Sequence, residues 1–287
     1  MSEISNVKLI CMDMDGTLFA SGEKVPKINR LALGECEKRG IHLALVSGRN
    51  YRFLSENARA ISNNIAVVSA NGARIDERPG GKCVFEGVFD PSEARRVSDV
   101  MWSTGAYYEI YTGTTNFAFR YDAIPPVHKK SLERYIRNGQ ILGCEFPTGP
   151  RYADYNGIYK FVAFSDNPTE IEKIRSILDA NNIPHSSSGA QNVETMAPGV
   201  GKGRALEMLA KHFNVDICDT MAFGDYTNDC DMLSACGHPV AMANGVQELK
   251  RIAELIAPPN TEGGVGKVIF EKVLNMPIPD ITGEADD

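Results

Sequence analysis

The 287-residue sequence predicts an α/β fold, in which a doubly wound, Rossmann-like parallel sheet carries a second, α+β unit inserted into it. Three observations predict this arrangement. Residues 7–70 alternate short apolar runs with segments of helical spacing, in the order β-α-β-α-β. Further along the chain, strands become aromatic and alternating, and the first pattern then returns. We therefore expect residues 1–81 and 191–287 to form the core and residues 82–190 to form the inserted unit.

The core begins with an apolar run at residues 7–12, which ends at a polar turn containing glycine, as a strand buried in a parallel sheet does. Pro26 then opens a segment of helical spacing, and residues 38–40 end it with two cations and a glycine. By the same criteria, the next elements are a strand at 41–46, a helix at 51–61 and a strand at 65–70.

The inserted unit contains alternating strands at residues 107–111 and 116–121 and an apolar strand at 158–164. Helices are predicted to start at Pro91 and Pro168, because each follows a good capping residue. The core then resumes with a helix at 202–213, a strand at 220–223, a helix at 228–235, a strand at 239–242, a helix at 246–253 and a loosely held acidic tail at 277–287.

Composition excludes several classes of protein. The chain has 30 Lys+Arg and 37 Asp+Glu, a net charge of −7, which argues against nucleic acid or an anionic membrane as a partner. No apolar run is long enough to span a membrane, and the N-terminus lacks a signal peptide, so a cytoplasmic location is expected. The seven cysteines form no Cys-x-x-Cys pair, which argues against a disulfide framework or a zinc ribbon.

Polar residues gather where ligands bind in such sheets, at the carboxyl ends of the strands. Asp13 and Asp15 follow the first strand, Ser47 the second and Asp225 the fourth, while Lys202 begins a nearby helix. Carboxylates this close repel one another unless a cation lies between them. Oxygen ligands beside a phosphate site favour Mg²⁺, and the lysine would attract a phosphoryl group. The combination indicates phosphoryl transfer.

Two aspartates one residue apart can divide the chemistry. Asp13 can attack phosphorus, and Asp15 can protonate the leaving oxygen and later activate water. The alternative is a turn or a calcium loop, but an EF-hand would need a glutamate twelve positions on from either aspartate, and none is there. Taken alone, Ser47 would be a helix cap and Lys202 a solvated lysine. Asp229 is expected to orient Asp225 or metal-bound water.

At these motifs the chain resembles the haloacid dehalogenase superfamily of phosphatases, in particular its Cof-type members with a large α/β cap. The resemblance implies a nucleophilic Asp13, a general acid and base in Asp15, and Mg²⁺ held by Asp13, the Asp15 backbone carbonyl and Asp225. It implies that residues 82–190 are the cap, which selects the substrate. The phosphate- and substrate-binding residues that it implies are Met14 and Gly48 through their backbones, Thr17, Ser47, Lys202 and Asn228.

The sequence thus predicts a Mg²⁺-dependent phosphatase acting on a small phosphorylated metabolite, with a sugar phosphate implied by the resemblance. A phosphomutase of the same fold and a non-catalytic, receiver-like phosphoacceptor are the alternatives. Tyr107, Tyr108 and Tyr111 either line the substrate face of the cap or belong to its core, since side chains alternate along a strand. The sequence does not determine the oligomeric state or the physiological substrate.

Overall fold

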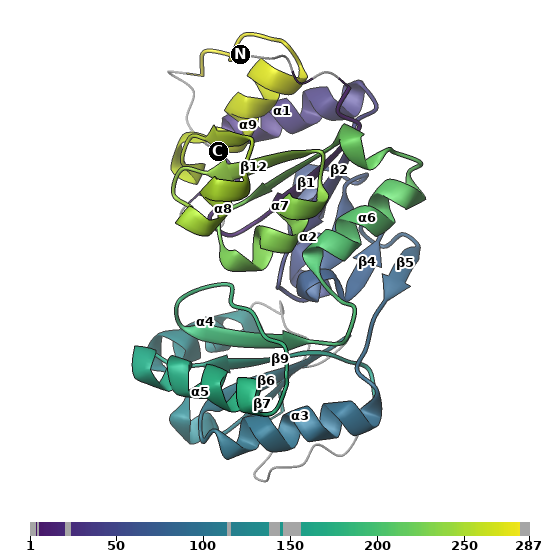
Figure 1. The fold of residues 1–287 in the computed structure, drawn as a ribbon. Coiled ribbons are helices and arrows are strands. Elements are labelled where there is room, and N and C mark those ends of the chain that lie inside the picture. Colours follow the sequence, from purple (N-terminus) through teal and green to yellow (C-terminus); the bar gives the residue numbers. More distant parts are fainter. Residues whose placement is uncertain are drawn as a thin grey trace.

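The structure, a computed structural model, describes residues 4, 6–20, 24–113, 116–137, 144–145 and 156–281. Its strands form two sheets in two halves of the molecule (Figure 1). The chain passes between the halves after β5 and again before α6. Within the described residues, no helix combines the length and the apolar character needed to cross a membrane.

The first sheet has eight strands in the order β13-β12-β11-β1-β2-β3-β4-β5. Strand β1 lies inside it and pairs in parallel with both β2 and β11. The predicted doubly wound parallel sheet is therefore confirmed, with an antiparallel extension of two short strands at one edge. The strands are β1 (Leu9–Asp13), β2 (His42–Val46), β3 (Ala66–Ser69), β4 (Arg74–Asp76), β5 (Cys83–Glu86), β11 (Thr220–Gly224), β12 (His238–Met242) and β13 (Leu255–Ala257).

Helices cover both faces of this sheet. Along β1, Ile10 and Met12 pack with the side chains of α1, α2 and α9, whereas Leu9 and Cys11 pack with those of α6, α7 and α8. Because both faces are buried, the strand is apolar throughout, which explains its continuous sequence signal. The helices are α1 (Lys27–Lys38), α2 (Tyr51–Ile61), α6 (Lys202–His212), α7 (Cys230–Ala235), α8 (Gln247–Ile252) and α9 (Gly264–Val268).

The second sheet has five strands in the order β10-β9-β6-β7-β8. Helices α3 and α5 lie on its side away from the first sheet (Figure 1). Both begin at the predicted prolines, and Asp90 and Asn167 accept hydrogen bonds from backbone N–H groups in the first turn of their helices. The elements are α3 (Pro91–Ser103), β6 (Tyr107–Thr112), β7 (Asn116–Phe119), α4 (Pro126–Arg137), β8 (Cys144–Glu145), β9 (Ile158–Phe164), α5 (Pro168–Ala180) and β10 (Asn192–Met196).

Two strands fall on the other side of the predicted unit boundaries. Strand β5 lies within the predicted insert of residues 82–190, yet it forms a hairpin with β4 in the first sheet. Strand β10 lies within the predicted core segment of residues 191–287, yet it pairs with β9 in the second sheet. Hydrogen bonding to a neighbouring strand decides sheet membership, and composition alone does not reveal that partner.

Two further predictions differ in detail. The helix predicted at 228–235 begins as a 3₁₀ turn at Thr227–Asp229, and α7 starts only at Cys230. In this turn the Asp229 carboxylate accepts hydrogen bonds from the N–H groups of Asp225 and Tyr226, which fixes the loop before the helix. Of the predicted loose tail at 277–287, residues 282–287 lie outside the described residues.

Candidate functional site

The carboxyl ends of three neighbouring strands build the floor of the site. Strands β2, β1 and β11 run parallel and side by side, so Asp13 at the end of β1 lies between the segments that follow β2 and β11. Those segments carry Ser47 and Asp225, and the first turn of α6 brings Lys202 to the same place. The sequence prediction of convergence at this edge of the sheet agrees with the structure.

Lys202 is the central cation of the site. Its side chain is 1% exposed, and its Nζ lies 2.6 Å from Asp13 Oδ1 and 2.6 Å from Asp229 Oδ1. Burial alone would lower the pKa of Lys202, but the charges of Asp13 and Asp229 outweigh burial and raise it. The lysine is therefore charged, and it holds one oxygen of each carboxylate.

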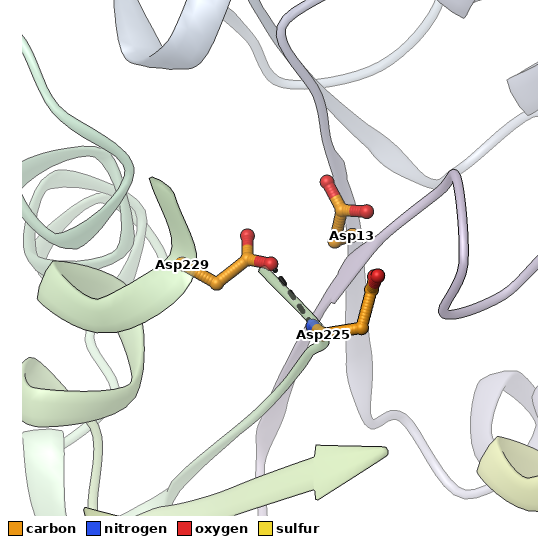
Figure 2. A group of neighbouring side chains, drawn as sticks. All are labelled: Asp13, Asp225 and Asp229. Carbon is orange, nitrogen blue, oxygen red and sulfur yellow. Dashed lines mark hydrogen bonds between the residues drawn. The ribbon is translucent and has the colours of Figure 1, made fainter. Parts of the chain in front are cut away.

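The pKa of the Asp13 carboxyl group is raised by its surroundings. Burial raises the pKa of Asp13 well above its usual range, the neighbouring carboxylates of Asp229 and Asp225 raise it further, and Lys202 opposes them. Figure 2 shows the carboxyl groups of Asp13, Asp225 and Asp229 directed toward a common space. One oxygen of each lies within 4.8 Å of the others. The site thus concentrates negative charge that one lysine only partly balances.

Asp225 is held in place by the loop that follows β1. Thr17 donates a hydrogen bond from its hydroxyl to Asp225 Oδ1 over 2.7 Å. Gly16 has a φ of +84°, and a Cβ there would lie 2.3 Å from Asp225 Oδ2, so both the turn and the close approach require glycine. Burial raises the pKa of Asp225 to about 6, although the hydrogen bond from Thr17 lowers it.

The donor set fits a hard divalent cation. Both oxygens of Asp229 are engaged, one with Lys202 and the other with the N–H groups of Asp225 and Tyr226. By contrast, within the described part of the chain, Asp13 and Asp225 each keep one oxygen without a hydrogen bond. Mg²⁺ prefers oxygen ligands, and its charge would offset the mutual repulsion of these carboxylates. Asp13 and Asp225 are thus available as ligands, and Asp229 positions Lys202 and the loop.

Asp15 is paired with an arginine that sequence reasoning did not single out. Arg49 Nε lies 2.7 Å from Asp15 Oδ2, and Arg49 Nη2 lies 2.8 Å from Asp15 Oδ1. The guanidinium also stacks over the ring of Phe53, with 4.1 Å to its centroid. The signal was available, because Arg49 stands two residues after Ser47 at the end of the second strand. Arg49 thus engages both carboxylate oxygens of Asp15.

A cavity of about 270 Å³ opens above this floor. Asp13, Asp15, Ser47, Gly48 and Asn228 line it, so five of the predicted site residues face one space. Ser47 is buried, and its hydroxyl accepts a hydrogen bond from the backbone N–H of Arg49 over 3.2 Å. A ligand in this space would meet both predicted catalytic aspartates.

Three predicted phosphate-binding residues, Met14, Thr17 and Lys202, do not line this cavity. The side chains of Met14 and Thr17 are fully buried. The Thr17 hydroxyl donates its proton to Asp225, so this hydroxyl holds that carboxylate in position, and the predicted phosphate contact of Thr17 stays a prediction. Met14 packs in the apolar core, which leaves only its backbone for the predicted role.

The second sheet forms the opposite wall of the cavity. Tyr111, Lys160 and Glu194 line it together with His128 of α4. Side-chain alternation resolves the open question about the tyrosines, because Tyr111 faces the cavity whereas Tyr108 packs in the apolar cluster against α3 and α5. Tyr107 is buried, and its hydroxyl donates to Glu109.

A buried carboxylate supports this wall. Glu109 is 1% exposed and accepts hydrogen bonds from Tyr107 over 2.6 Å and Asn116 over 3.5 Å, and its Oε1 lies 2.7 Å from His128 Nε2. Burial would raise the pKa of Glu109, but the hydrogen bond and the charge of His128 lower it. The His128 ring stacks on Phe164, with 3.8 Å between centroids. Glu109 and Phe164 therefore hold His128 at the cavity edge.

Comparison with known proteins identifies relatives along nearly the whole chain. Residues 10–269 match the model of the haloacid dehalogenase-like hydrolase family. The chain is 28% identical to the phosphatase YwpJ of Bacillus subtilis, over 92% of this chain and 99% of that protein. It is 29% identical to an HMP-PP phosphatase of Cronobacter sakazakii, over 86% of this chain and 88% of that protein.

A solved structure shares the fold. A haloacid dehalogenase-like hydrolase from B. subtilis superposes with a TM-score of 0.79 and 27% sequence identity, covering 92% of this chain and 99% of the other. The match extends across both sheets, because the shared length includes the second sheet as well as the first. The resemblance found in the sequence motifs is confirmed.

Proposed function

The chain belongs to the haloacid dehalogenase-like hydrolases, and on that premise we propose that it is a Mg²⁺-dependent phosphatase of small phosphorylated metabolites. A sugar phosphate is the first substrate class to test. The observation that carries the proposal is the cluster of Asp13, Lys202 and Asp225, in which Asp13 lines the cavity. Two relatives are named as phosphatases, which supports the proposed reaction type. The cytoplasmic location expected from the sequence is part of the same proposal.

Asp13 is the proposed nucleophile. Its carboxylate forms a bond to phosphorus while the bond from phosphorus to the ester oxygen breaks, which leaves an aspartyl-phosphate. Lys202 fixes the carboxylate through Oδ1 and offers positive charge to the transferring phosphoryl group. Ser47, the Gly48 backbone and Asn228 complete the phosphate-binding set, and their place on the cavity wall supports this role.

Asp15 is the proposed general acid and base. Protonated, it gives a proton to the leaving oxygen, and as a carboxylate it then takes a proton from the water that hydrolyses the aspartyl-phosphate. In the structure both of its oxygens face Arg49. We propose that Arg49 sets the direction of the Asp15 carboxylate, because its two hydrogen bonds engage both oxygens while each oxygen keeps a further lone pair for proton transfer.

Asp13, Asp225 and the backbone carbonyl of Asp15 are the proposed metal-holding groups. When bound, Mg²⁺ would offset the charge of the carboxylates and of the phosphoryl group. Thr17 holds one oxygen of Asp225, and the carboxylate of Asp229 braces the Asp225 loop. These contacts support an assignment in which both residues position the ligands rather than bind the ion.

The second half of the molecule is the proposed substrate-selecting cap. Its sheet supplies the aromatic and polar wall opposite Asp13, whereas the groups assigned to the chemistry come from the first half. A wall that can separate from the floor allows substrate to enter, and closure then excludes water. Selection of the leaving group is therefore expected to depend on cavity residues such as Tyr111 and His128.

A phosphate-release panel tests the proposal. The wild-type protein with Mg²⁺ is assayed against sugar phosphates, nucleotides, phosphoserine and the HMP-PP that the name of one relative gives. Release of inorganic phosphate from at least one class, absent in Asp13→Asn, is expected. Formation of an isomer without phosphate release would indicate a phosphomutase. A stable phosphoprotein without turnover would indicate a receiver-like module.

A further inference from the structure

Lys160 belongs to the second sheet, but its ammonium group reaches the turn that follows β2 in the first sheet. The side chain is 3% exposed and lines the cavity. Lys160 pairs with Tyr111 on β6 and with Met196 on β10. A Cβ built on Gly48 would lie 3.3 Å from Lys160 Nζ, so only a glycine lets the lysine come this close without a shift.

The surroundings of Lys160 leave part of its hydrogen-bonding capacity unused. Its Nζ donates to Glu194 Oε2 over 3.0 Å and lies 4.6 Å from the centroid of the Tyr111 ring. An ammonium group has three N–H donors. Among the described residues, Glu194 is the single hydrogen-bond acceptor that the ammonium group reaches. A second N–H is directed at the face of the Tyr111 ring. One donor is left for a ligand.

Glu194 holds this lysine in position. Its carboxylate accepts hydrogen bonds from Asn71 Nδ2 over 2.5 Å and from the Ser188 hydroxyl, as well as from Lys160. Burial would raise the pKa of Glu194, but the charge of Lys160 and these hydrogen bonds lower it. Because Asn71 comes from the first half of the molecule, the contact aligns Lys160 only when the two halves lie together.

A second polar atom near Gly48 also lacks a partner. Asn71 is 1% exposed, and its Oδ1 is buried with no hydrogen-bond donor in the described part of the chain. A Cβ on Gly48 would lie 3.0 Å from this oxygen. A buried acceptor without a donor is unfavourable. The same place thus has a spare donor on Lys160 and a spare acceptor on Asn71, which a hydroxylated phosphate ester can satisfy together.

We propose that Lys160 is a substrate-binding residue whose ammonium donates to an oxygen of the phosphoryl group held at the Ser47–Gly48 turn. This inference rests on the proposed function and adds a phosphate ligand supplied by the second sheet. Glu194 is its positioning residue. The cap then does more than select a leaving group, because full phosphate affinity requires the closed arrangement in which Lys160 reaches Gly48.

The test measures phosphate affinity separately from turnover. Binding of inorganic phosphate in the presence of Mg²⁺ is measured by calorimetry for the wild type, Lys160→Met and Lys160→Gln, and p-nitrophenyl phosphate is used for kinetics. Loss of one charge-assisted hydrogen bond is expected to weaken phosphate binding about tenfold or more and to raise KM for the aryl phosphate similarly. Lys173→Met, which removes an exposed lysine from α5, is the matched control and should bind as the wild type does.

The outcomes separate this inference from the proposed function. Wild-type phosphate affinity in folded Lys160→Met or Lys160→Gln would overturn the role of Lys160 while leaving the phosphatase reaction intact. An effect confined to the metabolite substrate, with phosphate binding unchanged, would place Lys160 against the leaving group and would also overturn the assignment. Absence of phosphate release from every substrate by the wild type would instead overturn the proposed function. Lys160→Arg should recover part of the affinity, since it restores the charge.

Discussion

Replacement of Lys202 by methionine is expected to remove activity and to destabilise the fold. The side chain is 1% exposed and makes two contacts of 2.6 Å, with Asp13 and Asp229. Methionine has a similar length but no charge. The substitution therefore leaves two carboxylates facing each other without their shared cation, and it fills most of the space that the lysine occupied.

The structure allows the magnitude to be worked out. Each hydrogen bond to a charged group contributes about 1.5–3 kcal/mol. Two such bonds give about 3–6 kcal/mol, in line with the roughly 3–5 kcal/mol for breaking a buried ion pair. The loss is limited because Asp13 already has a raised pKa and can take up a proton once Lys202 is gone. We expect about 3 kcal/mol in the free energy of unfolding at neutral pH.

The loss should depend on pH with a definite sign. The raised pKa of Lys202 means that its stabilising contribution is present at every pH below the ordinary pKa of lysine and is lost only above that range. The wild type therefore keeps this contribution across the acidic and neutral range. In the variant, Asp13, whose pKa burial raises, takes up a proton as the pH falls, which relieves its repulsion of Asp229, so the difference in unfolding free energy between the two proteins should shrink toward acidic pH.

Urea unfolding of the metal-free proteins, followed by far-ultraviolet circular dichroism, measures this difference. Lys211→Met removes an exposed lysine from the same helix and serves as the control, with an expected change below about 0.5 kcal/mol. If Lys202→Met were as stable as Lys211→Met at neutral pH, or if it kept phosphatase activity, Lys202 could not be the shared cation of this site.

Three further predictions concern the groups around this cation. Thr17→Val should weaken Mg²⁺ activation about 10–100-fold, because Asp225 loses the hydrogen bond that positions it. Thr17→Ser keeps the hydroxyl and should stay near the wild type. Equal effects of the two substitutions would refute the role of the Thr17 hydroxyl in positioning Asp225. Mg²⁺ affinity, measured by titration, should fall as the pH drops through about 6, because the raised pKa of Asp225 makes protons compete with the ion; a flat profile would contradict this. Arg49→Lys should lower turnover while leaving Mg²⁺ affinity unchanged, because lysine cannot hold both oxygens of Asp15. Turnover equal to that of the wild type would show that the Arg49–Asp15 pair is dispensable.

Sequence reasoning predicted the parallel sheet well, because each of its central strands is buried on both faces. Strand β1 shows this, since Ile10 packs on one side and Cys11 on the other. Strands β4, β5, β8, β10 and β13 were not predicted, and β4 and β10 illustrate the reason. β4 is three residues long, and Glu194 on β10 faces the cavity rather than an apolar core, so neither strand has a clear apolar pattern.

In the candidate site, too, some residues were predictable from the sequence and others were not. Asp13, Ser47 and Asp225 were predictable because they stand at strand ends, which topology brings to one edge of the sheet. The contacts of Thr17 and Arg49 were not, because a pattern in the sequence does not say which oxygen a hydroxyl or a guanidinium will reach. Lys160 was missed because it lies inside a strand of otherwise apolar and aromatic residues, where its spacing carries no catalytic motif.

The central claim is that the carboxylate of Asp13 becomes phosphorylated during turnover. Asp15→Asn, mixed with Mg²⁺ and p-nitrophenyl phosphate and then quenched in acid, provides the most direct measurement. The leaving group needs little help from a general acid, whereas hydrolysis needs the missing base, so the intermediate should accumulate. Peptide mass spectrometry should then find one phosphoryl group on Asp13 and none in an Asp13→Asn, Asp15→Asn double variant. An Asp13 that stays unmodified in Asp15→Asn, while the wild type releases phosphate from the same substrate, would contradict the account.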